Sequence, residues 1–111
     1  MIQITTHILD TTKGKPAAGV NIILFKNEAD FTEIASGTTN ADGRIPDLLP
    51  KDKTLEKGIY KMRFEVKPYF DKDGIAAFYP FVEITFEINS GDHYHIPLLL
   101  NPFGYSTYRG S

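Results

Sequence analysis

The fold of this chain is decided near its end, in the stretch His93-Tyr94-His95-Ile96-Pro97-Leu98-Leu99-Leu100. Successive side chains of a β-strand point to opposite faces of its sheet, so this stretch divides into two sets. The set on one face is aromatic or aliphatic throughout, as a core face requires: Tyr94, Ile96, Leu98 and Leu100. The other face carries His93 and His95, about 7 Å apart along the strand. We therefore expect a strand of a packed sheet that presents two imidazoles away from the core.

The segment after this strand is unusual for a chain end. Proline cannot donate a hydrogen bond to a neighbouring strand, so Pro97 predicts a bulge or an unpaired position. The final residues are Tyr105-Ser106-Thr107-Tyr108-Arg109-Gly110-Ser111. Terminal segments usually fray and are polar, whereas this one is aromatic and contains an arginine, so we expect it to be held in place. Residues 104–108 are β-prone and uncharged, which predicts a sheet edge that pairs with another subunit.

The same alternation of apolar and polar residues predicts further strands at residues 2–9, 58–66 and 81–88. Residues 20–25 are apolar on both faces apart from Asn21, which predicts an interior strand, and residues 32–39 form a weaker, β-branched strand. Residues 45–57 hold two prolines and mixed charges, so we expect a loop with at most a short edge strand. Residues 71–78 are the only plausible helix, and Gly74 weakens it. Seven or eight short strands with one short helix predict an all-β fold, a two-sheet antiparallel sandwich or a barrel. A chain of 111 residues has the length of one domain, spanning residues 1–111.

Three histidines and one arginine are the residues most able to carry chemistry. His7 lies on the face of the first strand opposite its isoleucines. If that strand and the strand at 93–100 are neighbours in one sheet, His7 converges with His93 and His95. Asp42-Gly43 is typical of a tight turn, so Arg44 leaves that turn with its planar, charged guanidinium available to an oxyanion. Solvated surface histidines are one alternative. Zinc bound by the three histidines is another, although no acidic residue completes a second shell around such a site.

Composition excludes several classes of protein. The absence of cysteine excludes disulfides, thiolate metal sites and a cysteine nucleophile. A net charge of −2 and a pI near 5.9 argue against nucleic acid or an anionic membrane as the main partner. No apolar run approaches the ~20 residues that cross a bilayer, and residues 1–5 lack the features of a signal peptide. We therefore expect a cytoplasmic protein that binds neither nucleic acid nor membrane.

Four segments together resemble a known family. They are the run from His93 to Ser111; Thr6-His7-Ile8-Leu9-Asp10-Thr11 followed by Gly14-Lys15-Pro16-Ala17; Thr39-Asn40-Ala41-Asp42-Gly43-Arg44; and Phe78-Tyr79-Pro80-Phe81-Val82. The chain resembles the transthyretin-like 5-hydroxyisourate hydrolases over essentially its whole length. The terminal Tyr108-Arg109-Gly110-Ser111 is the motif that separates these hydrolases from transthyretin, the thyroid-hormone carrier of the same fold.

This resemblance implies a transthyretin-like sandwich assembled as a homotetramer, a dimer of dimers, with substrate clefts where the dimers meet. It implies hydrolysis of 5-hydroxyisourate to 2-oxo-4-hydroxy-4-carboxy-5-ureidoimidazoline in urate degradation, with no metal or other cofactor. The implied catalytic residues are His7, Arg44, His95 and Ser111. The implied substrate-binding residues are His93, Tyr108, Arg109 and Gly110.

Two questions remain open at the level of sequence. Either His7 or His95 is suited to take a proton from water, because an imidazole titrates near neutral pH. A small-ligand carrier like transthyretin is the alternative function, which the terminal motif and the outward histidines disfavour. A plain interaction domain leaves the three histidines and Arg44 unexplained.

Overall fold

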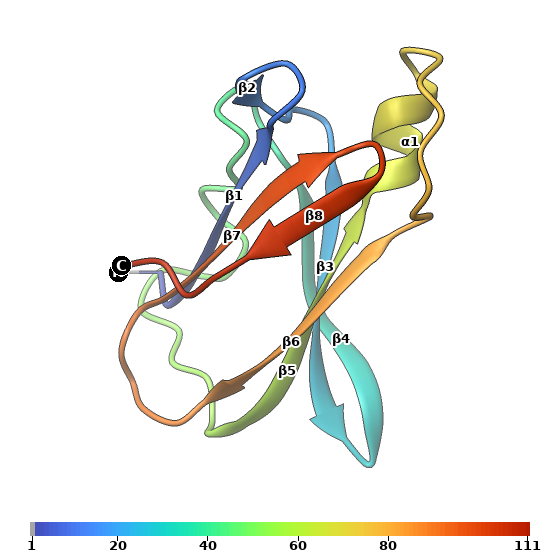
Figure 1. Ribbon diagram of the computed structural model, residues 1–111. Helices are drawn as coiled ribbons and strands as arrows, with labels where there is room; N and C mark the ends of the chain where they lie inside the picture. Colours follow the sequence, from blue (N-terminus) through green and yellow to red (C-terminus); the bar gives the residue numbers. More distant parts are fainter. Residues whose placement is uncertain (1) are drawn as a thin grey trace.

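The computed structural model describes residues 2–111, which form two four-stranded sheets packed face to face with one short helix at one end (Figure 1). One sheet has the strand order β2-β1-β7-β8 and the other the order β4-β3-β5-β6. The elements are β1 (Ile4–Asp10), β2 (Lys15–Pro16), β3 (Asn21–Glu28), β4 (Asp30–Thr38), β5 (Gly58–Glu65), α1 (Val66–Asp71), β6 (Val82–Ile88), β7 (Tyr94–Asn101) and β8 (Gly104–Thr107). The predicted all-β sandwich with one short helix is confirmed.

The core lies between the two sheets and follows the predicted alternation. In β5 the side chains of Tyr60, Met62 and Phe64 are fully buried, while the residues between them are only partly covered. In β7 the fully buried Leu98 faces them from the other sheet. Burial of such side chains contributes roughly 1.5–3 kcal/mol each. The face of β7 that carries His95 is therefore the outer face of its sheet.

One strand pair departs from the antiparallel expectation. β1 and β7 run parallel, with Thr5 beside His95 and His7 beside Pro97. A hairpin forces neighbouring strands to be antiparallel, but these two strands come from opposite ends of the chain, so no hairpin joins them. The antiparallel prediction is therefore wrong for this pair and holds for every other pair of strands within residues 2–111. This pairing brings the first strand, β1, beside β7 from near the end of the chain, in the middle of the sheet (Figure 1).

The helix prediction was wrong in position. The helix spans Val66–Asp71, whereas residues 71–78 were expected. Its buried residues are Val66, Tyr69 and Phe70, spaced at the i, i+3 and i+4 positions of a helical face. The strand-like alternation of residues 58–66 concealed this start, because Val66 ends the one pattern and begins the other. Gly74, with φ of +67°, lies in the turn after the helix.

The terminal segment is attached along the edge of β7. Leu98 pairs with Thr107 and His95 pairs with Gly110, but the ladder between these pairs is interrupted opposite Pro97. The predicted unpaired position at Pro97 is thus confirmed on the side of β7 that faces β8, whereas on the other side Pro97 pairs in register with His7 of β1. Residues 108–109 are released from the sheet, and the backbone then returns to it at Gly110. Residues 45–57 form the expected loop.

Candidate functional site

The three histidines lie together on the outer face of the β1–β7 pair. His93 and His95 stack with ring centroids 6.3 Å apart and planes 22° apart. Thr5 on β1 has its hydroxyl oxygen 2.7 Å from Nε2 of His93 and 2.8 Å from Nδ1 of His95. His7 lies two residues further along β1 and is close enough to affect the titration of His95. The predicted convergence of the histidines is therefore confirmed.

Arg44 reaches this cluster because its turn is docked on β1. The side chain of Asn40 accepts hydrogen bonds from the amides of Asp42 and Arg44, which builds the turn. Gly43 has φ of +72°, and its carbonyl accepts a hydrogen bond from the amide of Ile8 at 3.0 Å. A Cβ at Gly43 would come 2.5 Å from the carbonyl oxygen of Ile8. Only glycine allows this approach, which brings Arg44 close enough for its charge to lower the pKa of both His7 and His95.

The electrostatics of the cluster favour the neutral forms of His7 and His95. Burial lowers the pKa of His95, and the Arg44 guanidinium lowers it further. Burial also lowers the pKa of His7, as does Arg44, while a hydrogen bond to the backbone of Asp42 acts in the opposite direction. Within residues 2–111 the Arg44 guanidinium forms no hydrogen bond or ion pair. The site therefore combines neutral proton acceptors with an exposed cation that has no protein partner.

The terminal segment contributes to this site unequally. The amide of Gly110 donates a hydrogen bond to the carbonyl oxygen of His95 at 2.8 Å. A Cβ on Gly110 would collide with Cδ2 of the His95 ring, so the backbone lies directly against the imidazole. Tyr108 and Ser111 are exposed. No ion pair joins the Ser111 carboxylate to an arginine in the described part of the chain.

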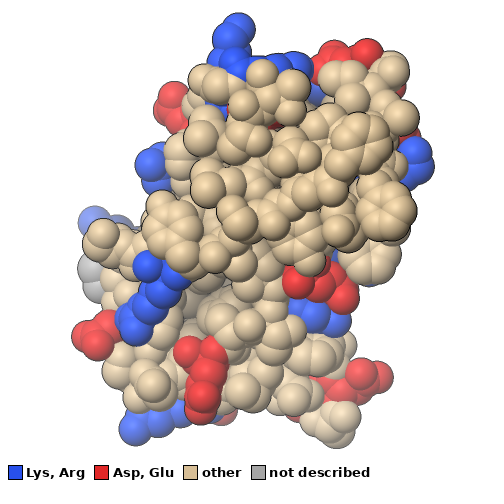
Figure 2. All heavy atoms as spheres, in the orientation of Figure 1, with Lys and Arg blue, Asp and Glu red and all other residues tan. Residues whose placement is uncertain are grey.

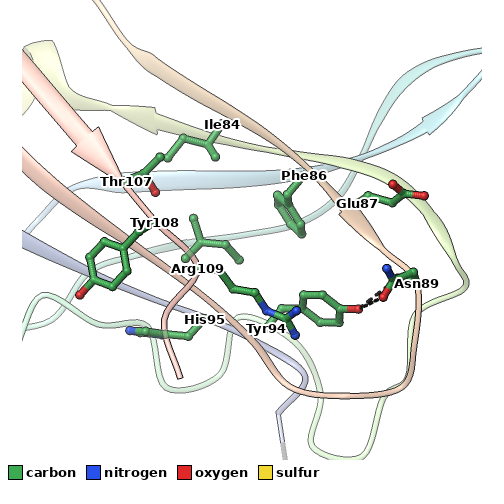
Figure 3. Close-up of a pocket in the computed structure, with 10 residues that line it drawn as sticks. Ile84, Phe86, Glu87, Asn89, Tyr94, His95, Thr107, Tyr108 and Arg109 are labelled. Carbon is green, nitrogen blue, oxygen red and sulfur yellow. Dashed lines mark hydrogen bonds between the residues drawn. The ribbon is translucent and has the colours of Figure 1, made fainter.

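Arg109 turns away from the histidines. Its guanidinium carbon lies 4.4 Å from the ring centroid of Tyr94, a residue of the core face of β7 (Figure 3). The Tyr94 hydroxyl is fixed by a 2.9 Å hydrogen bond to Asn89. Tyr108 points in the other direction in the same view. Arg109 thus anchors the terminal segment across the mouth between the two sheets.

A pocket of about 290 Å³ opens at this mouth. Its walls come from β6, β7 and the terminal segment, and include Ile84, Phe86, Tyr94, Ile96 and Arg109. His95 is the one member of the histidine cluster that borders it. Of the predicted site residues, the structure groups His7, Arg44, His93, His95 and Gly110. Tyr108, Arg109 and Ser111 lie around that group.

Thr5 is the residue that sequence reasoning missed. Its place on the outer face of β1 was visible from the alternation, as for His7. Its contact with two imidazoles depends on the parallel register of β1 with β7, which no local pattern predicts.

Among residues 2–111, no group of three or more His, Asp or Glu side chains is arranged to hold a metal ion. That stretch also contains no helix long and apolar enough to cross a membrane.

Comparison with known proteins identifies the family. The model of the HIUase/Transthyretin family matches residues 4–110. The chain belongs to this family. A relative from Schizosaccharomyces pombe, named probable 5-hydroxyisourate hydrolase, is 53% identical over 97% of this chain and 90% of its own length.

Solved structures of two kinds share the fold of this family member. The 5-hydroxyisourate hydrolase of Klebsiella pneumoniae is 39% identical, with a TM-score of 0.85 over 97% of this chain and 98% of its own. Sea bream transthyretin in complex with thyroxine is 32% identical, with a TM-score of 0.91 over 98% of this chain and 95% of its own. Since a hydrolase and a transthyretin with bound thyroxine both share this fold closely, the fold alone does not decide the function.

Proposed function

We propose that this chain hydrolyses 5-hydroxyisourate, yielding 2-oxo-4-hydroxy-4-carboxy-5-ureidoimidazoline in urate degradation. The observation that carries this proposal is the pairing of neutral imidazoles with the unpartnered Arg44 guanidinium on one face of the sheet. A carrier needs complementary walls but has no need of proton acceptors beside a free cation. The names of relatives that match nearly the full chain support the same activity.

The proposed chemistry is water attack on a ring carbonyl. A neutral histidine, His95 or His7, accepts a proton from water as the water oxygen bonds to the carbonyl carbon. The carbonyl oxygen gains negative charge in this step, and Arg44 stabilises it. The carbon–nitrogen bond of the ring then breaks, and the histidine returns the proton to the departing nitrogen. No metal is required by this sequence of steps.

The remaining residues hold the substrate and shape the cleft. We assign His93, Tyr108 and Gly110 to the substrate-facing wall, with Ser111 at its end. Arg109 supports this wall by anchoring the segment on Tyr94. We further propose a homotetramer, a dimer of dimers, in which the clefts lie where the dimers meet. The exposed aromatic side chains near β8 support such an assembly.

The second candidate is a small-ligand carrier, favoured by the close superposition on transthyretin with bound thyroxine. A binding titration with thyroxine separates the two functions. Hormone binding without hydrolysis would support the carrier. Hydrolysis at a rate well above spontaneous decay supports the enzyme.

The decisive assay follows the ultraviolet decay of freshly made 5-hydroxyisourate. We expect Arg44→Gln to lower kcat by about 10²–10³-fold, the scale of removing one oxyanion donor. Arg63→Gln is the matched control, because Arg63 lies on the other sheet and pairs with Glu65 and Glu83. His7→Asn and His95→Asn identify the base by the larger loss of kcat. Chelator should leave the rate unchanged. Unaltered activity in Arg44→Gln would contradict the proposed role of Arg44.

The rate of hydrolysis should change with pH in one direction, falling only on the acid side. A general base acts only when neutral, and the pKa of His7 and of His95 lies below the ordinary value near 6.5. The rate should therefore be constant through neutral pH and fall only below about pH 6.5. A fall that begins above pH 7 on acidification would contradict neutral imidazoles in the site.

A further inference from the structure

Thr5 bridges the two stacked imidazoles of β7 from the neighbouring strand. Its hydroxyl oxygen lies 2.7 Å from His93 Nε2 and 2.8 Å from His95 Nδ1, both within hydrogen-bond distance. The parallel register pairs Thr5 directly with His95. Both histidines therefore keep one ring nitrogen outside this bridge, Nδ1 in His93 and Nε2 in His95.

A hydroxyl carries one proton, so it donates to one imidazole and accepts from the other. In the first arrangement His95 donates from Nδ1 to Thr5, and Thr5 donates to Nε2 of His93. This leaves Nε2 of His95 with a free lone pair, able to act as a base. In the second arrangement both bonds are reversed, so Nε2 of His95 carries the hydrogen and is not a base.

Protonation of either histidine selects one arrangement. A proton from water that binds Nε2 of His95 breaks a water O–H bond, forms an N–H bond and leaves the bridge as it was. A proton taken up by His93 gives that ring two N–H groups, so Nε2 must donate to Thr5. Thr5 must then donate to Nδ1 of His95, which imposes the second arrangement.

We propose, on the basis of the function proposed above, that Thr5 is a positioning residue that sets the tautomer of His95 and couples it to the protonation of His93. In the neutral site Thr5 holds His95 as a base directed at water. When His93 gains a proton, the shared hydroxyl reverses and withdraws His95 from catalysis.

The charges around the bridge are consistent with this coupling. His7 from β1 and Arg44 from the docked turn both disfavour a positive charge on His95. From the terminal segment, Gly110 lies against the His95 ring, Ser111 follows with the terminal carboxylate, and Arg109 is directed onto Tyr94. His93 also lowers the pKa of His95, so a positive charge on His93 disfavours a proton on His95.

The first test measures the tautomers by ¹⁵N NMR of the full-length protein without substrate. We expect wild type and Thr5→Ser to hold His95 with the hydrogen on Nδ1 at neutral pH. Thr5→Val keeps the β-branched shape but lacks the hydroxyl, so it should give a mixture of tautomers. Thr11→Val is the matched control, because Thr11 bonds only to the Leu100 carbonyl. A single, unchanged His95 tautomer in Thr5→Val would overturn the proposal.

The second test is the rate as a function of pH. Thr5→Val should lower kcat by about tenfold or more with little change in KM, and Thr5→Ser should restore most of it. His93→Gln cannot gain a proton, so the acid side of its kcat profile should move to lower pH than in wild type. A profile that matches wild type in His93→Gln would overturn the coupling. If the protein does not hydrolyse 5-hydroxyisourate, the proposed function fails, and the NMR result still decides the role of Thr5.

Discussion

At the scale of single residues, Gly110 has the most specific requirement in the site. Its backbone lies against the His95 ring, where a Cβ would overlap the imidazole. We predict that Gly110→Ala lowers kcat by about ten- to hundredfold, because either the ring or the terminal segment must move by a fraction of an ångström or more. Steady-state kinetics measures the loss, and circular dichroism checks that the fold is kept.

Gly104→Ala is the control for this prediction. Gly104 is also a glycine of the terminal segment, but a Cβ there meets nothing closer than 3.7 Å, from Asn101. It should therefore retain wild-type kcat. Full activity in Gly110→Ala would show that the close contact with His95 has no part in catalysis.

The residues of the candidate site differ in how far their positions follow from sequence. The outward positions of His7, His93 and His95 follow from strand alternation. Residues an odd number of positions apart lie on opposite faces of a strand, and buried isoleucine or leucine residues lie one or three positions from each histidine. The position of Arg44 follows from the turn chemistry of Asp42-Gly43. The bridge made by Thr5 does not follow, because it requires knowing which strands are neighbours and in what register.

At the scale of elements, α1 is attached to the first sheet through one buried hydrogen bond. The Tyr69 hydroxyl donates to Oδ2 of Asp10 at 2.8 Å, and both residues are buried. The other oxygen of Asp10 accepts from the amides of Thr12 and Lys13, which ends β1 in a tight turn. Burial and the Asp10 carboxylate raise the pKa of Tyr69, so its hydroxyl stays protonated as a donor.

We predict that Tyr69→Phe lowers the free energy of unfolding by about 2 kcal/mol, because a buried carboxylate oxygen loses its donor. Urea denaturation at fixed protein concentration measures the change. Tyr79→Phe is the matched control, since the Tyr79 hydroxyl makes no hydrogen bond within the described chain, and it should change stability by less than about 0.5 kcal/mol. Equal effects of the two substitutions would contradict a specific role for the Asp10 bond.

The position of α1 shows where element prediction reaches its limit. A helix of six residues contains too few turns to give a clear 3.6-residue period. Pro68 reinforces a non-helical interpretation, although proline is tolerated in the first turn, where its missing N–H has no intrahelical partner. The longer strands, such as β1, β5 and β6, were easier to predict because each repeats its two-residue period several times, whereas the two-residue β2 was not predicted.

At the scale of the whole molecule, the surface over β7 and β8 is almost free of charge (Figure 2). Phe103 in the turn between these strands is 69% exposed, and Phe78, which lies close to that turn, is 71% exposed. Patches of this kind on small proteins mark contact surfaces. Together with the free edge of β8, they support the proposed homotetramer.

We predict that the protein sediments at four times its chain mass of 12.5 kDa and that Phe103→Asp lowers this mass. A buried phenylalanine contributes about 1.5–3 kcal/mol, and four copies of the substitution multiply that loss in a tetramer. Ile34→Asp is the matched control, because Ile34 is exposed on β4, an edge of the other sheet, and its substitution should leave the mass unchanged. If the clefts require neighbouring dimers, kcat should fall in parallel with the tetramer fraction as Phe103→Asp is diluted. A monomeric wild type with full activity would show instead that one chain contains the complete site.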